Sequence, residues 1–485
     1  MGEAYSGPVP QFNSSVRIEA RPERLSSDGG AVLLREVAER TGILDWLDAR
    51  LSDGRNPELL THPQRELLAT TLLLMAQGWR DQDDADALRD DPVFRLAVSS
   101  RRGVGPLFPP GDGAPHSSPD GLASQPTLSR LYRRLSTDDN RQVCRTGLMV
   151  QAGRRLRALR GGRVPFAPLD IDSLPVEVEG RQDESAYNAH YHARIYHPLV
   201  ASLGELGDIV DVRLRKGTAH TAEGALDFIL PLVDTVIEHV CETTCVRMDA
   251  GFPAEPLLAG LEARGVPYVA RVKNNAVLDR LAGPVLAIPE VVAMLPGDEF
   301  FAEYTYQAGS WSRPRRAVLV VVRRIGELIP THFWLLTSYA PEQKGACALL
   351  DLYRKRGSAE ALMGEWMNVI EPALSSVRRA KSHYRGNAPG KRTEPGEPFA
   401  INEVILLLSA LAYNLGHALR VVTADATGEP WSLQRLRDRV LKTAARVLVH
   451  ARRATIVVPA AAGELWTAVW AALSGLQPIP MARSG

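Results

Sequence analysis

The order of strand and helix patterns between residues 164 and 275 restricts the possible folds more than any other feature of the chain. Residues 164–216 alternate between apolar and polar side chains and predict three strands, the last two joined around Gly204–Gly207. A helical pattern, a short strand "CVRMDA", an amphipathic helix "AEPLLAGLEARG" and a strand "PYVARVK" follow in turn. This β-β-β-α-β-α-β order predicts an α/β domain with a mixed sheet flanked by helices.

The flanking regions have different patterns. Residues up to about 160 have helical patterns apart from a loop rich in Pro, Gly and Ser at 101–121. Strand patterns such as "RRAVLVVVRRIG" return after 276 without a helical pattern between them. Helical patterns resume at 345 with "GACALLDLYRKRGSAEALMGEWMNVI", which predicts one helix. The predicted domains are a helical N-terminal region (1–160), a first part of the α/β core (161–275), an all-β insertion (276–340), a second part of the core (341–425) and a C-terminal helical region (426–485).

Composition excludes several classes of protein. The net charge of +1 gives no overall attraction to nucleic acid, so any such attraction has to come from local clusters of Lys and Arg. Four scattered cysteines and the lack of a signal-peptide pattern predict a protein of the reducing cytoplasm. The most apolar run begins at Val404, but Asn414, His417 and Arg420 interrupt it, so it predicts a buried helix and no membrane span.

Carboxylates occur on these elements where acidic residues are uncommon. Asp170 and Asp172 lie two apart on the first strand and so face the same side, and Asp249 ends the fourth strand. If those strands are neighbours, the carboxylates meet at the sheet edge where α/β folds usually bind ligands. Asp249 has an alternative role as the cap of the following helix, and Asp172 as the start of a turn. Oxygen ligands without cysteine suit Mg²⁺, or Mn²⁺ in its place, and two such ions serve phosphodiester chemistry.

A second set of charged residues lies in "YRKRGSAE", residues 353–360. Tyr353, Arg356 and Glu360 are spaced three and four apart, so on one helix they share a stripe. Glu360 is the candidate third carboxylate, and the planar guanidinium of Arg356 suits a phosphate. Glu365 is a rival for the role of Glu360.

Together these motifs resemble the ribonuclease H-like Asp-Asp-Glu transposases of bacterial insertion sequences. Tyr353, Arg356 and Glu360 match their Y-x2-R-x3-E-x6-K motif, although Met367 stands at the position of the lysine. "LDIDS", "RMDAGF", "YVARVKNN" and "ALSSVRRAKSHYRG" resemble the branch called transposase DDE domain, group 1, so the likeness covers most of the chain. Asp172 fits the family's Asp followed by a small residue better than Asp170 does.

The resemblance implies a ribonuclease H-like fold and a cut-and-paste transposase. Asp172, Asp249 and Glu360 would be catalytic and hold the metal, with Asp170 as an alternative ligand. The implied partner is double-stranded DNA, both the terminal inverted repeats and the target, bound by a homodimer whose helical N-terminal region recognises the repeats. The other predicted contacts to DNA or phosphate are Tyr353, Arg356, Lys273, Trp311 as a holder of a flipped base, and the basic residues Arg378, Arg379 and Lys381.

Several alternatives remain open from the sequence. Trp334 competes with Trp311, and Lys355, Arg354 or Lys273 could replace the lysine that Met367 displaces. Met367 also favours a transposase-derived DNA-binding protein without catalytic activity, and a third hypothesis is a nuclease that cuts without joining. His190, His192 and His197 invite a metal site, but packing beside DNA or the core is the preferred interpretation.

Overall fold

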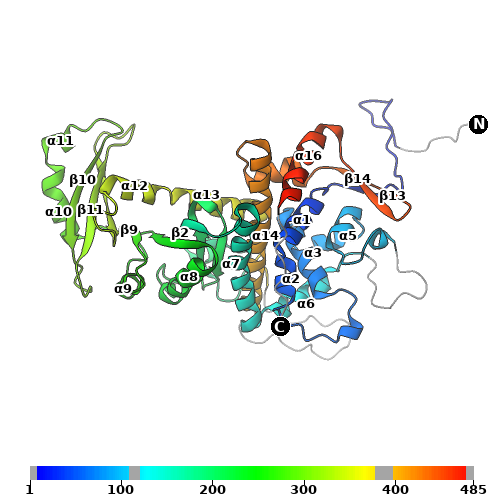
Figure 1. Cartoon of the computed structure of the whole chain (residues 1–485), viewed down its shortest axis with the longest axis horizontal. Helices are drawn as coiled ribbons and strands as arrows, with labels where there is room; N and C mark the ends of the chain where they lie inside the picture. The colour runs from blue at the N-terminus through cyan, green and yellow to red at the C-terminus, as the bar shows by residue number, and fades with distance from the viewer. Residues whose placement is uncertain (1–7, 109–120, 377–396, 477–485) are drawn as a thin grey trace, which may run out of the picture.

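The computed structural model of the chain describes residues 8–108, 121–376 and 397–476. Figure 1 shows a helical part and a sheet-containing part on either side of the long helix α14 (Glu397–Thr427). The strands β10 and β11 lie at the end of the molecule farthest from the helical part. The region that holds the predicted carboxylates therefore lies between a helical body and a protruding sheet.

The sheet has eight strands in the order β10-β11-β12-β9-β8-β2-β6-β7. β2 pairs in parallel with β8, and β8 with β9, whereas β6 and β7 continue the sheet antiparallel on the other side of β2. Each strand and helix predicted between 164 and 275 is present, which confirms the mixed, helix-flanked sheet of a ribonuclease H-like fold. The elements are β2 (Val164–Ser173), β6 (Leu199–Leu203), β7 (Ile209–Arg213), α8 (Ala225–His239), β8 (Cys241–Met248), α9 (Glu255–Ala263) and β9 (Tyr268–Val272).

The predicted insertion differs from the all-β segment expected at 276–340. It begins with two helices, α10 (Ala276–Leu286) and α11 (Pro289–Val292), before its strands β10 (Glu299–Tyr306), β11 (Arg315–Val322) and β12 (Thr331–Thr337). The side chain of Asn275 accepts hydrogen bonds from the backbone nitrogens of Val277 and Leu278, so it caps α10. β12 pairs with β9, and the three strands therefore extend the central sheet.

The N-terminal and C-terminal regions share one apolar core. Helix α14 packs against α3 (Gln64–Ala76), α7 (Asp138–Arg160) and α16 (Ala460–Gly475), and β1 (Leu25–Ser26) pairs with β13 (Ala445–His450). The C-terminal region is not all helical as predicted, because β13 and β14 (Arg453–Val457) form a hairpin. The alternation in "RVLVHARRATIVV" carries this strand signal.

Helix α14 has the length and apolar composition of a membrane-spanning helix, yet 83% of its most apolar window is buried inside the protein. Its polar side chains are bonded within the core: Asn414 bonds both the nitrogen and the oxygen of Ile209, and Asn402 donates to the hydroxyl of Tyr196. These contacts agree with the predicted buried helix.

A small sheet precedes β6, made of β3 (Val176–Glu177), β5 (Ala193–Tyr196) and β4 (Ala186–Asn188). The histidines of this segment differ in their surroundings. His190 and His192 are exposed in the turn between β4 and β5, and Nδ1 of His197 lies 2.9 Å from the backbone oxygen of Ala219.

His417 on α14 belongs to a buried polar cluster. Its Nε2 lies 2.7 Å from the backbone oxygen of Leu206, and Arg420 Nη2 lies 2.6 Å from its Nδ1. The neutral tautomer with a proton on Nε2 satisfies both contacts. Burial lowers the pKa of His417 to about 3, against the opposing charge of Asp208.

Because His417 is buried in its neutral form, we expect the protein to lose stability in acid. Below pH 6.5 the unfolded chain protonates its histidine while the folded chain does not until about pH 3, so stability falls as pH falls through this window. The contribution of His417 is at most about 1.4 kcal/mol per pH unit. Urea unfolding of wild type and His417→Gln between about pH 6 and 4 checks this, with a shallower slope expected for the variant.

The exposed His450 provides the control, because His450→Gln is expected to keep the wild-type slope. Equal slopes for wild type and His417→Gln would contradict the buried neutral state of His417.

Candidate active site

The parallel pairing of β2 with β8 brings two of the predicted carboxylates to one edge of the sheet. Ile171 pairs with Met248, so Asp172 and Asp249 both come one residue later on neighbouring strands. The predicted adjacency of the first and fourth strands is therefore confirmed. Since the carboxyl ends of parallel strands meet at the same edge, this edge is the natural ligand site of the sheet.

Asp170 is engaged elsewhere. Arg247 of β8 donates from Nε and Nη2 to its two carboxylate oxygens, each at 2.6 Å, and both side chains are buried. Burial raises the pKa of Asp170 to about 6, while the bonds from Arg247 oppose that rise. Asp172 is more accessible, with its side chain 19% exposed against 1% for Asp170, and its oxygens accept from Arg356 and from the nitrogen of Ser173. The preference for Asp172 over Asp170 stays a prediction.

Asp249 does not cap the helix that follows it. Its Oδ1 accepts a hydrogen bond of 2.7 Å from the nitrogen of Gly251, whereas α9 begins at Glu255 with Ala254 in the cap position. Asp249 is half-buried at the end of β8. Its carboxylate is therefore held by a hydrogen bond within a local turn, and not by a bond to the helix that follows.

The Y-R-E motif spans a junction between two helices, and the single helix predicted there is wrong. Helix α12 (Ala346–Arg354) ends before α13 (Gly357–Glu365) begins, and the nitrogen of Arg356 bonds the oxygen of Tyr353 at 2.9 Å. This hydrogen bond spans three residues, one fewer than in an α-helix, so the chain makes a tighter turn here. Gly357, which follows at the break, is a weak helix former. Tyr353, Arg356 and Glu360 nevertheless line one cleft.

Arg356 links two of the three predicted carboxylates. Its Nη2 donates to Oδ2 of Asp172 at 2.6 Å and its Nη1 to Oε1 of Glu360 at 2.8 Å. The side chain is 8% exposed, and its Nε is buried with no hydrogen-bond partner among the described residues. Burial lowers the pKa of Arg356, but Asp172 and the other nearby acidic groups raise it overall. The guanidinium is therefore a fixed positive charge among the carboxylates.

The pKa of Asp172 is affected by the same charged neighbours. Burial raises its pKa, the charge of Arg356 opposes the rise, and Asp249 and Glu360 add to it. Asp249 and Glu360 thus act on Asp172 through space, although the side chain of Glu360 is 62% exposed and that of Asp172 only 19%.

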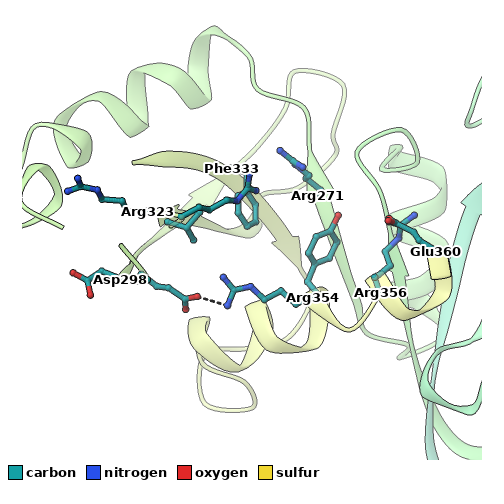
Figure 2. Close-up of a pocket in the computed structure, with 13 residues that line it drawn as sticks. Arg271, Asp298, Arg323, Phe333, Arg354, Arg356 and Glu360 are labelled. Carbon is teal, nitrogen blue, oxygen red and sulfur yellow. Dashed lines mark hydrogen bonds and ion pairs between the residues drawn. The ribbon is translucent and has the colours of Figure 1, made fainter. Parts of the chain in front are cut away.

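A cleft of about 390 Å³ leads from this site toward the extended part of the sheet. Figure 2 shows Arg356 and Glu360 at one end, Asp298 and Arg323 at the other, and Phe333 between them. The guanidinium of Arg271 lies 5.1 Å from the ring centre of Phe333. The other lining residues include Tyr353, Val322, Arg324, Arg354, which pairs with Glu299, and Gly357.

Sequence reasoning missed Arg271 and Phe333. Arg271 is exposed on β9, and within the described part of the chain it has no ion-pair partner. Its position in "YVARVKNN" near the end of a strand parallel to β8 was a usable signal, because that end lies at the carboxylate edge. No signal in the sequence pointed to Phe333.

Trp311 lies away from the carboxylates. It occupies the turn between β10 and β11 and is 8% exposed, with its ring 5.4 Å from that of Tyr306. Because β12 runs antiparallel to β9 and Thr337 pairs with Arg316, this turn lies toward the opposite edge of the sheet. Trp334 is completely buried.

Lys273 is exposed just beyond β9, and Lys355 is 62% exposed, 3.8 Å from Glu205. Arg378, Arg379 and Lys381 lie outside the described residues. Met367 is half-buried and packs against the apolar core, in a π-helical turn spanning Trp366–Ile370. A lysine at this position would bury its stem in the same core.

Glu365 has a structural role. It accepts a hydrogen bond from Arg420 of α14 and another of 3.0 Å from the nitrogen of Leu433. It therefore fastens the end of α13 to α14 and to α15 (Leu433–Leu436). These bonds favour Glu360 over Glu365 as the third carboxylate of the site.

The donor set of the site fits a hard divalent cation. Asp172, Asp249 and Glu360 offer oxygen atoms alone, which Mg²⁺ prefers. Among residues 8–108, 121–376 and 397–476, no three or more His, Cys, Asp or Glu side chains are already placed to hold a metal ion. Two of the three carboxylates, Asp172 and Glu360, form ion pairs with Arg356.

Comparison with known proteins decides the family. The model of the transposase DDE domain group 1 family matches residues 9–479. The chain belongs to this family. A search of curated proteins gave no match. Among solved structures the chain is similar to a piggyBac transposase in a synaptic complex with hairpin DNA, with 12% identity, a TM-score of 0.40, and coverage of 85% of this chain and 79% of that chain.

The family match makes the chain a transposase, and its DDE domain implies nuclease and transposition activity. Its membership rests on the family model over almost the entire length and not on the weaker structural likeness.

The two glutamates of α13, Glu360 and Glu365, are expected to differ in how much they contribute to stability. Glu365→Gln weakens a charge-assisted bond to Arg420, which is mostly buried, and is expected to lower the free energy of unfolding by about 1–3 kcal/mol. Glu360→Gln changes a mostly exposed side chain and is expected to stay within about 0.5 kcal/mol of wild type. Urea denaturation measures both, and a larger loss for Glu360→Gln than for Glu365→Gln would contradict these roles.

Proposed function

We propose that this transposase cuts the ends of an insertion sequence and joins them to target DNA, with Asp172, Asp249 and Glu360 as its catalytic carboxylates. One observation carries the proposal: neighbouring parallel strands present Asp172 and Asp249 at one edge, and Arg356 connects Asp172 with Glu360. Acidic residues with a shared arginine, beside a cleft lined by further arginines, suit a site that handles phosphodiesters.

Asp172, Asp249 and Glu360 would hold divalent metal, as Mg²⁺ or Mn²⁺. When bound, such ions favour attack on a phosphodiester by stabilising charge on the attacking and leaving oxygens. Arg356, whose Nε has no partner among the described residues, would donate from its guanidinium to the phosphate beside the scissile bond.

The cleft supports a path for the DNA strand away from the carboxylates. Arg271 and Arg323 offer guanidinium groups along it, and the ring of Phe333 with Arg271 above it provides a surface on which a base can stack. Phe333 thus suits the role that the sequence gave to Trp311, because β12 begins at the carboxylate edge and Trp311 lies toward the other. Tyr353 lines the same cleft and would contact the adjacent phosphate.

The partners of this activity would be double-stranded DNA, as terminal inverted repeats and as target. A homodimer that holds both ends is supported by the family resemblance, as is recognition of the repeats by the N-terminal helices. Met367 stands where the family motif has a lysine. Arg271, a cation beside the site, would supply the phosphate contact expected of that lysine.

Strand cleavage tests the proposal. A labelled duplex that carries the inverted repeat flanking the gene is incubated with wild type, Asp172→Asn, Asp249→Asn or Glu360→Gln, in Mg²⁺ or Ca²⁺. Wild type is expected to cut with Mg²⁺ alone, and each variant to lose at least about a hundredfold in rate, since each removes a charged metal ligand. Asp351→Asn, an exposed carboxylate of α12, is the control and should cut normally.

The other outcomes separate the alternatives. Undiminished cutting by Asp249→Asn would overturn the carboxylate assignment. Tight binding without cutting by wild type would indicate a DNA-binding protein without catalytic activity, which Met367 favours. Cutting without joining of the freed 3′ end to a target would indicate a nuclease that lacks strand transfer.

Arg271 gives a separate prediction about DNA binding. Arg271→Gln removes an exposed guanidinium that faces the cleft, so affinity for a pre-cut end is expected to fall about tenfold. The dependence of binding on salt should weaken by about one phosphate contact. Fluorescence anisotropy at several salt concentrations measures both. Arg264→Gln, on an arginine outside this cleft that pairs with Asp234, should bind like wild type, and equal losses for the two variants would contradict a specific role for Arg271.

A further inference from the structure

A buried guanidinium connects the segments that present the site. Arg247 is completely buried in β8, and Asp170 opposite it in β2 is 1% exposed. The two form a bidentate pair, with Nε to Oδ1 and Nη2 to Oδ2 both at 2.6 Å. The pair therefore lies across the same two strands that end in Asp172 and Asp249.

The third nitrogen of Arg247 reaches the helix junction. Nη1 donates to the backbone oxygen of Leu352 at 3.0 Å. In a continuous helix the nitrogen of Arg356 would bond this oxygen, but here it bonds the oxygen of Tyr353. Arg247 thus satisfies a carbonyl that the break between α12 and α13 leaves without its helical partner, and its positive charge suits a helix C-terminus.

The sequence positions of these contacts are close to the site in each segment. Asp170 lies two residues before Asp172, and Arg247 lies two residues before Asp249. Leu352 immediately precedes Tyr353 and the turn that carries Arg356. One planar group with fixed bond directions therefore joins both strands and the junction.

The surroundings leave room for this guanidinium. A Cβ atom on Gly204 would lie 2.6 Å from Arg247 Nη2, so any larger residue at 204 would displace the group. Glu205 adds a weaker contact to Nη1 at 3.4 Å. A buried ion pair is a poor means of gaining stability, since apolar residues of similar volume often serve equally well. A role in geometry accounts better for its presence here.

We propose that Asp170 and Arg247 are positioning residues that set Tyr353 and Arg356 at the correct place relative to Asp172 and Asp249. This inference rests on the proposed function of those four residues. It assigns to Asp170 a role other than metal binding, and it explains why two acidic residues lie on one face of β2.

The test replaces the pair by apolar residues, as Asp170→Leu with Arg247→Met, which leaves no unpaired charge. The matched control is Asp211→Leu with Arg145→Met, since Arg145 and Asp211 form a similar bidentate pair between α7 and β7. Single-turnover cleavage of a bound, labelled repeat end is expected to fall about a hundredfold in the first double variant, because small displacements at a reacting centre are costly. Its affinity for the same DNA should stay within about threefold of wild type, and the control should keep both values.

Hydrogen exchange provides a readout that does not depend on cleavage. The amides of Arg356 and Ser358, which bond within the junction, should exchange about tenfold faster in the Asp170→Leu, Arg247→Met protein than in wild type or the control. If wild type cuts no DNA but the double variant still exchanges about tenfold faster than wild type at these amides, the proposed function fails and the positioning role stands. Unchanged exchange, or cleavage at the wild-type rate, overturns the positioning role.

Arg247→Lys decides the question if the double variant does not fold. A lysine keeps the charge opposite Asp170 but cannot make the paired bonds and reach Leu352 at the same time. Slower cleavage with unchanged DNA affinity supports the proposal, and wild-type cleavage by Arg247→Lys overturns it.

Discussion

The parallel pairing of β2 with β8 is the constraint on which the remaining structure depends. These strands are far apart in the sequence, and their register places Asp172 beside Asp249 at the same edge. Helix α8 supplies the connection that lets two strands run in parallel, as such pairs require. Without this pairing neither the carboxylate edge nor the pair of Asp170 with Arg247 would form.

Charge balance explains how the protein keeps acidic groups close together. Like charges raise one another's pKa, and Asp172 shows this effect in addition to its burial. Arg356 offsets it by bonding Asp172 and Glu360 at once, while Glu365 on the same helix is neutralised by Arg420. The glutamates five residues apart are therefore distinguished by their partners: one faces the cleft, and the other fastens α13 to the core.

The sequence predicted the α/β core well because each element there has a regular period and a clear boundary. The strand that bears Asp172 is buried from Ala167 to Ile171, and the helices carry apolar stripes. The break at Arg356 was missed because the residues on both sides of it have a helical pattern and a single glycine, Gly357, is a weak signal, whereas Arg247 reaches the junction through a tertiary contact. Trp311 and Phe333 show the same limit, since which edge an aromatic ring occupies is decided by strand register and not by neighbours in the chain.

The predicted domain boundaries follow changes in sequence pattern. They do not follow the packing of the long helix α14. The boundary at 160 and the one at 425 separate segments that bury their apolar faces together, with α14 packed against α3, α7 and α16. Asn414 on this helix bonds β7 of the sheet, and Ser409 bonds the ring nitrogen of Trp366 just beyond α13. Contacts of α14 therefore connect the N-terminal helices with the segment that follows the helix carrying Glu360. Because packed interiors resist small deformations, the helical part and the carboxylate edge are mechanically connected through α14.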